Sequence, residues 1–181
     1  MLIHQGTPTL KTRRLTLRPF CTDDAHDMFT NWASDPEVTR FLMWPAHESI
    51  AVSEAVLADW IPHYNEPDYY HWAITLDGHA IGSMAVVNHD DLAQKAHIGY
   101  CIGKAWWHMG IMTEALQAVM DFLFDKVGYQ RIESRHDPRN PHSGAVMRKC
   151  GMHYEGTLRQ SDWNNQGICD ACWYALLKSE R

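Results

Sequence analysis

Residues 99–114 read GYCIGKAWWHMGIMTE and join an expected strand to an expected helix. From Gly110 onward, apolar side chains recur at helical spacing, and the pattern ends before Gly128, a residue suited to the position after a helix. The first backbone N–H groups of such a helix have no partner within it and lie at the positive end of its dipole. Gly110 would let a ligand approach the backbone closely. The stretch therefore predicts an anion site, although a glycine-containing loop of this kind also occurs for structural reasons alone.

Alternating and helical patterns place further elements around this stretch. Strands are expected over 14–18, 70–76, 80–87, 96–102, 131–135, 152–159 and 168–177. Helices are expected after residue 22, from residue 35, and over 48–61, 110–127 and 143–150. This order predicts an α+β domain with a mixed, mostly antiparallel sheet of about seven strands flanked by helices, and a strand–helix–strand unit in its second half. We expect one domain over 1–181, because domains cluster at roughly 100–150 residues.

The charge of the chain bears on its partners. A net charge of −6 argues against nucleic-acid binding, because phosphates must be neutralised by clustered lysine and arginine. Between Phe41 and Gln94 the chain has acidic residues but no lysine or arginine, and most of its basic residues come later. Such asymmetry could steer a cation to one part and an anion to the other, or both could be ordinary solvated surfaces.

No apolar run approaches the roughly 20 residues of a membrane span, and residues 1–14 lack the apolar core of a signal peptide. We therefore expect a cytoplasmic protein without membrane association, whose five cysteines stay reduced. Cys169 and Cys172 have CxxC spacing, but within a strand they face opposite sides, so no zinc site is expected there. The twelve histidines form no His-Glu-x-x-His motif and no compact cluster along the sequence.

The stretch 99–114 resembles the pyrophosphate-binding segment of GNAT superfamily N-acetyltransferases, Gln/Arg-x-x-Gly-x-Gly/Ala, in its RimJ/RimL-like form. The resemblance continues in order with TRRLTLRP at 12–19, DPEVT at 35–39, DPRNPHS at 137–143, KCGM at 149–152 and EGTLR at 155–159. Two positions depart from the family pattern, since Trp107 stands where Gln or Arg is usual and Met112 where Gly or Ala is usual. Backbone amides could still bind a pyrophosphate, provided that the Met112 side chain points away from it.

The resemblance implies a GNAT fold and acetyl-coenzyme A (acetyl-CoA) as cosubstrate. It also implies that an amine attacks the thioester directly in a ternary complex, without a covalent enzyme intermediate or a metal. The cofactor would lie against the end of one strand, the loop after it and the segment near Asn140. The residues implied in cofactor binding are Tyr100, Cys101, Ile102, Trp107, His108, Met109, Gly110, Ile111, Met112, Thr113, Asn140 and Ser143.

Two catalytic residues are implied. A protonated amine must lose a proton to attack, and the departing thiolate of coenzyme A benefits from a proton donor. Many GNAT enzymes use a tyrosine seven residues after the motif asparagine, but this chain has Met147 there. The RimJ/RimL-like pattern offers Ser143 as the donor, although a serine here would equally suit a helix cap. Asp162 matches an acidic residue implied as the general base, and it would also suit a turn.

The acceptor is less defined. The resemblance favours the N-terminal α-amine of a protein, including a ribosomal protein, and the acidic first half would attract a basic polypeptide. Aminoglycosides, polyamines and other small cationic amines are an alternative, because related enzymes modify them. A non-catalytic module that binds acyl-CoA is a further alternative, suggested by Trp107, Met112 and the missing tyrosine. The sequence leaves the oligomeric state open, including a homodimer.

Overall fold

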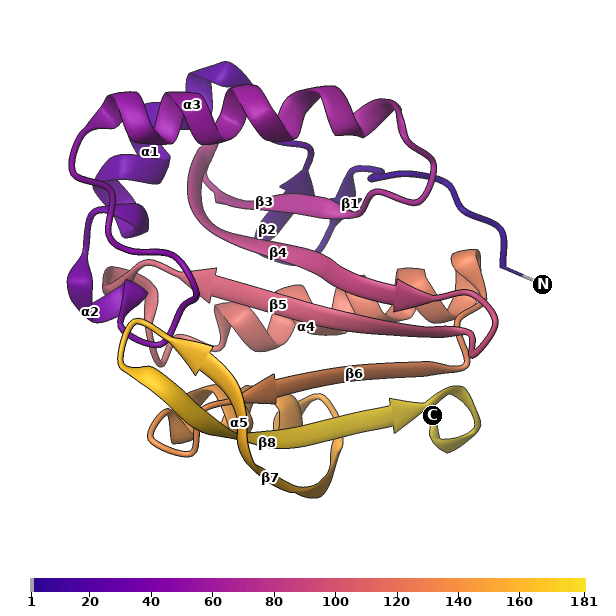
Figure 1. Cartoon of the computed structure of the whole chain (residues 1–181). Helices are drawn as coiled ribbons and strands as arrows, with labels where there is room; N and C mark the ends of the chain where they lie inside the picture. The colour runs from indigo at the N-terminus through magenta and orange to yellow at the C-terminus, as the bar shows by residue number, and fades with distance from the viewer. Residues whose placement is uncertain (1) are drawn as a thin grey trace.

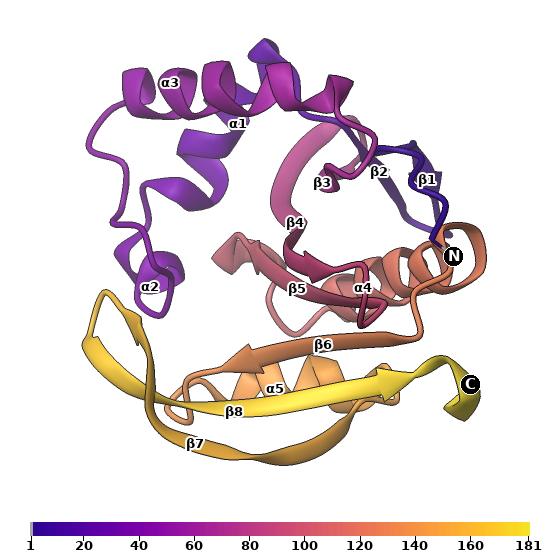
Figure 2. The same ribbon diagram turned by 45° about the vertical axis from the view of Figure 1, so that its right-hand side comes forward.

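The architecture is given by a computed structural model that describes residues 2–181 (Figures 1 and 2). Its centre is an eight-stranded sheet in the order β1-β2-β3-β4-β5-β6-β8-β7. The strands are β1 (Leu10–Lys11), β2 (Leu15–Arg18), β3 (His71–Leu76), β4 (His79–Asp90), β5 (Lys95–Ile102), β6 (Arg131–His136), β7 (His153–Asn164) and β8 (Gly167–Leu177). All neighbours pair antiparallel except β5 and β6, which are parallel. The mixed, mostly antiparallel sheet is confirmed, with one strand more than expected.

The helices follow the expected order with shifted ends. They are α1 (Ala25–Met28), α2 (Pro36–Thr39), α3 (Ile50–Trp60), α4 (Ile111–Phe122) and α5 (Pro141–Lys149). A wider turn over 123–127 continues α4 and ends at Gly128, whose left-handed φ of 100° favours glycine. Proline at the first position starts α5 two residues before the expected boundary. Within residues 2–181, no helix is both long and apolar enough to cross a membrane.

Apolar side chains on both faces of the sheet are covered by helices. One face packs against α4 and α5, and its core includes Trp72, Ile98 and Leu116. The other face packs against α1 and α3, and its smaller core includes Trp32 and Leu57. Figure 1 shows α4 and α5 behind the strands and α3 along the opposite edge of the molecule. The strands that lead to the loop after β5 are therefore covered on both faces.

The sheet opens in its middle. Strands β5 and β6 pair at only three positions, from Lys95 opposite Arg131 to His97 opposite Glu133. Beyond His97 the two strands are not paired, although β5 continues to Ile102 and stays paired with β4. The connection between them runs through α4, which makes β5–α4–β6 the expected strand–helix–strand unit. The resulting gap in the strand pairing lies next to the loop 103–110.

Candidate active site

The loop between β5 and α4 has a backbone that only certain residues adopt easily. Gly110 has a left-handed φ of 73° at the N-cap of α4, and His108 has a φ of 60°. For a residue with a side chain this conformation costs roughly 1–2 kcal/mol, so glycine suits position 110. Behind it, Ile111 and Met112 turn their side chains into the core, as was required of Met112. The backbone N–H groups that open α4 are thus presented at the end of the loop.

Residues from the first strands hold this loop in place. The Arg14 guanidinium donates to the Met109 carbonyl at 2.9 Å and to the Glu114 carboxylate at 2.7 Å. The Thr12 hydroxyl donates to the same carboxylate at 2.6 Å. Partial burial would raise the pKa of Glu114, but the hydrogen bonds from Thr12 and Arg14 outweigh it and lower the pKa. Glu114 therefore stays ionised and ties the start of α4 to the N-terminal strands.

A cleft of about 300 Å³ lies along this loop. Nearly all residues implied in cofactor binding line it: Tyr100, Cys101, Ile102, Trp107, His108, Gly110, Ile111, Met112, Thr113, Asn140 and Ser143. Met109 does not line the cleft, because its side chain is exposed and its carbonyl accepts from Arg14. The cleft also contains His142 and Lys149, which the sequence analysis did not assign to the site. Lys149 belongs to the segment KCGM at 149–152 that resembles the family, and this resemblance could have indicated that Lys149 lies at the site.

Two hydroxyl groups meet where β5 faces the start of α5. The Ser143 hydroxyl donates to the Tyr100 hydroxyl at 3.1 Å, and the Tyr100 hydroxyl donates to the Ser143 carbonyl at 2.9 Å. Ser143 is the third residue of α5, and Asn140 occupies the N-cap without a side-chain capping bond. Burial raises the pKa of Tyr100 well above its usual value, so its hydroxyl stays protonated. The Ser143 hydroxyl is therefore engaged with a tyrosine and not in a cap.

Met147 does not contribute to this site. Its side chain is fully buried in the main core. Position 147, where many GNAT enzymes have a tyrosine, therefore offers no hydroxyl to the cleft. The hydroxyls that line the cleft near α5 are those of Tyr100 and Ser143.

A second, larger cavity of about 550 Å³ adjoins the first. The two share lining residues, among them Tyr100, Asn140 and Ser143. Its walls include several aromatic side chains: Trp32, Phe41, Trp44, Trp60 and Trp163. The acidic residues of the stretch 48–91 do not line it. The hydroxyl pair thus lies where the cleft along the loop meets this second cavity.

The wall of this second cavity is fastened by the turn between β7 and β8. The Asn165 side-chain amide donates to the carbonyls of Thr39 at 2.8 Å and Trp44 at 2.7 Å, and the Asn165 backbone N–H donates to the Leu42 carbonyl at 3.0 Å. The segment 39–44 follows α2, near the other end of the chain. One wall of the cavity is therefore held by contacts between two segments more than a hundred residues apart in sequence.

Asp162 lines this cavity but is held by Arg135. The guanidinium donates to both carboxylate oxygens, at 2.5 and 3.1 Å, and the Trp163 backbone N–H also donates to one of them at 3.0 Å. A carboxylate in a two-point ion pair is neutralised as a charge and occupied as an acceptor. Asp162 therefore serves here in an ion pair with Arg135 on the neighbouring part of the sheet, and this pairing does not favour the role of general base.

Four histidines line the cavity with different freedom to accept a proton. The Nδ1 atom of His47 lies 2.8 Å from the Ser53 hydroxyl, and burial lowers the pKa of His47. Both ring nitrogens of His71 have hydrogen-bond partners, and Nε2 of His97 faces the Arg135 guanidinium at 3.4 Å. Burial lowers the pKa of His71 to about 3 and, with the nearby Arg135 charge, that of His97 to about 4. The fourth is His136, whose Nδ1 donates to the Asp137 carbonyl at 2.8 Å and whose Nε2 therefore carries the lone pair.

The Nε2 atom of His136 is buried and has no hydrogen-bond partner among residues 2–181. Burial lowers the pKa of His136, so its ring is neutral near pH 7. It packs against α5 next to Ser143, since a Cβ added to Gly144 would clash with Nε2. Sequence reasoning missed His136 because neither its tautomer nor its neighbours across the fold can be read from local spacing.

The paired cysteines have separate partners. Cys169 is buried and lies 3.4 Å from the Asn164 side-chain amide, whereas Cys172 contacts the Thr157 hydroxyl at 3.2 Å. The two thiols thus take part in different contacts along β8.

This fold and this pair of adjoining cavities define an acyl-CoA-dependent transferase. A family model described as an acetyltransferase (GNAT) domain matches residues 14–153. The chain belongs to the GNAT family of acetyltransferases and is an acetyl-CoA-dependent N-acetyltransferase. Its RimJ/RimL-like character is borne out by relatives that include a ribosomal-protein-serine acetyltransferase of Escherichia coli, 28% identical over 54% of each chain.

Other relatives match almost the whole chain. N-acetyltransferase YoaA of Bacillus subtilis is 31% identical, over 94% of this chain and 97% of its own length. N-acetyltransferase p20 of Bacillus licheniformis is 29% identical, over 95% of this chain and 97% of its own length. Among solved structures, RimL, a ribosomal L7/L12 α-N-protein acetyltransferase in complex with coenzyme A, superposes with a TM-score of 0.84 at 20% identity, over 94% of this chain and 98% of RimL. That likeness shows the GNAT fold.

Proposed function

We propose that this N-acetyltransferase acts on the N-terminal α-amine of a polypeptide whose first residues are apolar or aromatic. The observation that carries the proposal is the aromatic cavity of about 550 Å³ that meets the cofactor cleft at Tyr100 and Ser143. Its size falls in the range of specific ligand pockets, roughly 300–1,000 Å³. An amine placed at the junction would have its apolar body among the tryptophans.

The cofactor would occupy the first cleft. Its diphosphate would accept hydrogen bonds from the backbone N–H groups at the start of α4, with Lys149 and the histidines nearby on the same cleft. The gap in the pairing between β5 and β6 would receive the pantetheine arm, as the family resemblance implies. This would bring the thioester to the hydroxyl pair of Tyr100 and Ser143.

The transfer then needs an acceptor for the one proton that the neutral amine loses and a hydrogen-bond donor for the departing sulfur. The amine nitrogen attacks the thioester carbonyl carbon, the C–S bond breaks, and the sulfur leaves as a thiolate. The Ser143 hydroxyl would turn from the Tyr100 hydroxyl and donate a hydrogen bond to that sulfur. The Tyr100 hydroxyl would then donate to the Ser143 hydroxyl oxygen, because either hydroxyl can act as donor. His136 would accept the proton that the amine loses, because its ring lines the second cavity and its neutral Nε2, buried against Gly144, has no hydrogen-bond partner among residues 2–181.

The weak base and the charges of the cavity favour an α-amine over a polycation. With a pKa near 8, roughly a tenth of an α-amine is neutral at pH 7, against roughly four in ten thousand for lysine at a pKa near 10.4. A histidine of lowered pKa is a weak base, so it suits an α-amine and not the more basic amine of a lysine side chain. The acidic residues Asp137 and Asp162 in the cavity wall are each paired with an arginine. An aminoglycoside or polyamine would require carboxylates that are free to pair with several cations.

The test is release of coenzyme A thiol with a matched acceptor panel. Two peptides share one sequence with an apolar first residue and one lysine; the first has a free α-amine and a blocked lysine, the second the reverse. We expect turnover with the first peptide and background release with the second, with spermidine and with an aminoglycoside. Turnover on the polycations alone would contradict the proposal and support the small-molecule alternative.

A further inference from the structure

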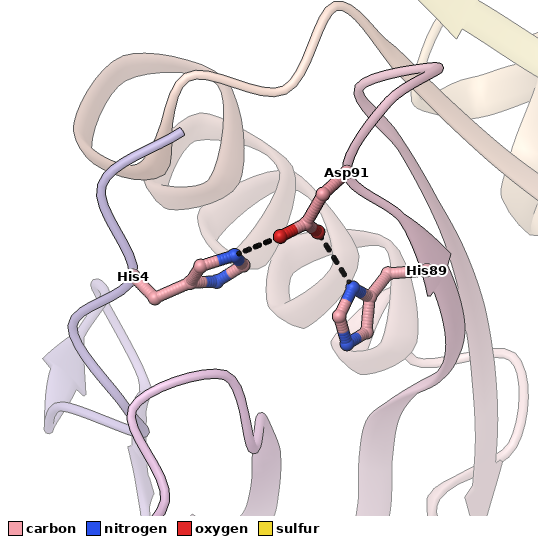
Figure 3. Close-up of side chains that lie close together, drawn as sticks. All are labelled: His4, His89 and Asp91. Carbon is pink, nitrogen blue, oxygen red and sulfur yellow. Dashed lines mark hydrogen bonds and ion pairs between the residues drawn. The ribbon is translucent and has the colours of Figure 1, made fainter. Parts of the chain in front are cut away.

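His4, His89 and Asp91 form a cluster far from the active site in the sequence and in the fold. The Asp91 carboxylate lies between the two rings, 3.1 Å from His4 Nε2 and 2.9 Å from His89 Nδ1 (Figure 3). His4 comes from the N-terminal segment, whereas His89 and Asp91 come from the end of β4 and the turn after it. The sequence analysis expected no compact histidine cluster, because the fold alone brings His4 to residues 85 or more positions away.

The three side chains match the requirements of a zinc site. One ligand atom from each lies within 4.8 Å of the others. Tetrahedral Zn²⁺ with ligands at about 2.0–2.2 Å places neighbouring ligand atoms about 3.3 Å apart. The two distances to the Asp91 carboxylate are already close to this value, and the two ring nitrogens, which lie within 4.8 Å of each other, would approach on binding. Imidazole and carboxylate are both ligands that zinc accepts.

The nitrogen of each ring that faces away from Asp91 also has an oxygen near it. The hydroxyl of buried Tyr70 lies 3.0 Å from His4 Nδ1, and the Asp68 carboxylate lies 3.8 Å from His89 Nε2. Histidines that bind metals usually make such a contact through the other nitrogen, because it fixes the tautomer and orients the ring. Asp68 and Asp91 together supply two negative charges, which balance a divalent cation.

We propose that His4, His89 and Asp91 bind Zn²⁺ and thereby fasten the N-terminal segment to the β4–β5 hairpin. Asp91 is half exposed, so water can complete the coordination. The cluster lies at the start of β5, and the cofactor cleft lies at its end, so the metal would be structural and would take no part in the acetyl transfer. The proposal is independent of the choice of acceptor.

Titration of the full chain with ZnCl₂ tests the proposal by calorimetry. We expect one Zn²⁺ per chain and a rise in Tm on binding. His89→Ala and Asp91→Ala should each weaken Zn²⁺ binding by at least about 100-fold, the upper limit for loss of a mere supporting contact. Tyr70→Phe removes such a contact and should weaken it by about 10- to 100-fold.

The matched control is His79→Ala. His79 lies 3.3 Å from the Asp27 carboxylate, which makes it a histidine–aspartate pair without a second histidine among the contacts of residues 2–181. Its loss should leave Zn²⁺ affinity unchanged. Circular dichroism of each variant checks that the fold is kept.

X-ray absorption of the zinc-loaded protein gives a second readout. The expected spectrum has two imidazole nitrogens at about 2.0–2.1 Å. Zinc binding that survives both His89→Ala and Asp91→Ala, for example at the neighbouring rings of His108 and His142, would overturn the proposal. Absence of binding to the unsubstituted chain, or a coordination shell of oxygen alone, would do the same.

Discussion

Ser143 was expected to act either as a proton donor or as a helix cap; its hydroxyl is bonded to Tyr100 and not in a cap, and the role of donor stays a prediction. In Ser143→Ala the departing thiolate loses a hydrogen-bond donor that matters only as the C–S bond breaks. We expect kcat to fall by about 100-fold, in the range found for loss of one positioned donor, with little change in the KM for acetyl-CoA. Steady-state kinetics on an active peptide would measure both.

Tyr100→Phe provides the companion variant. Because the two hydroxyls act together, it should lower kcat similarly, and the double variant should lose little more than either single one. Wild-type turnover in Ser143→Ala would show that its hydroxyl has no catalytic role.

His136 sets the expected pH dependence. A base must be neutral, and burial lowers the pKa of His136 below its ordinary value of 6.5. At saturating acceptor, kcat should therefore stay constant as the pH falls through 6.5 and decline only at lower pH, where the ring becomes protonated. His136→Gln should lower kcat and remove this decline. Asp162→Asn should keep the decline, and its loss in that variant would return the role of base to Asp162.

The composition of the site was predictable only where it follows the chain. Residues of the loop 103–110 and of β5 could be assigned to the cleft because they are contiguous in sequence and lead directly to the start of α4. The partner of Asp162, by contrast, lies 27 residues away on β6. Such pairs, and the tautomer of His136, depend on how strands align across the sheet, which local spacing does not encode.

Gly110 allows the loop and α4 to be tested as a unit. In Gly110→Ala the new Cβ would meet only Arg14, at 3.7 Å, so the effect comes from the left-handed backbone and the ligand. The strain should cost about 1–2 kcal/mol of stability. We also expect the Kd of coenzyme A, measured by calorimetry, to rise at least about tenfold, because the amides at the start of α4 would shift.

Gly128→Ala is the matched control, because Gly128 has a φ of 100° at the other end of the same helix. It should cost similar stability and leave coenzyme A binding unchanged. Equal Kd values of coenzyme A for the two variants would contradict the proposal that the cofactor binds at the start of α4.

Long elements with a clear period were predicted well, and short ones were not. The apolar stripe of α4 and the Asp77-Gly78 turn of the β3–β4 hairpin placed those elements correctly. Strand β1 has two residues and exists only through its pairing with β2, so no pattern within it could reveal it. The first helix, expected to be regular, is interrupted by a wider turn over Phe29–Ala33.

For the molecule as a whole, Asn165 joins two distant segments around the aromatic cavity. Asn165→Ala removes its side-chain bonds to Thr39 and Trp44. The KM for the peptide should rise about 5- to 30-fold, equivalent to about 1–2 kcal/mol, because the wall is no longer held. The KM for acetyl-CoA should stay the same, and a parallel rise in both would show a general loss of structure. Gln166→Ala, in the same turn, is the control, because the Gln166 side-chain amide donates only to the adjacent Asn165 carbonyl.

Stability in acid should depend on buried carboxylates. Burial would raise the pKa of Asp24, but two hydrogen bonds from Arg18 and one from the Cys21 backbone lower it. Its contribution is complete above the unfolded-state value of 3.8 and is lost as the pH falls through the lower folded-state pKa. In urea unfolding at pH 7, Asp24→Asn should cost about 2 kcal/mol, less than the ~3–5 kcal/mol of a fully buried pair because Arg18 is partly exposed. A loss of the same size at pH 2 would contradict this origin.

The early parting of β5 from β6 has a consequence for the resting enzyme. Peptide groups of β5 beyond His97 are not paired with β6, so this part of the sheet should exchange amide hydrogens for deuterium faster than its fully paired strands. The pantetheine arm of the cofactor, which carries amide groups of its own, would slow that exchange when bound. It would then take the place of a neighbouring strand beside β5.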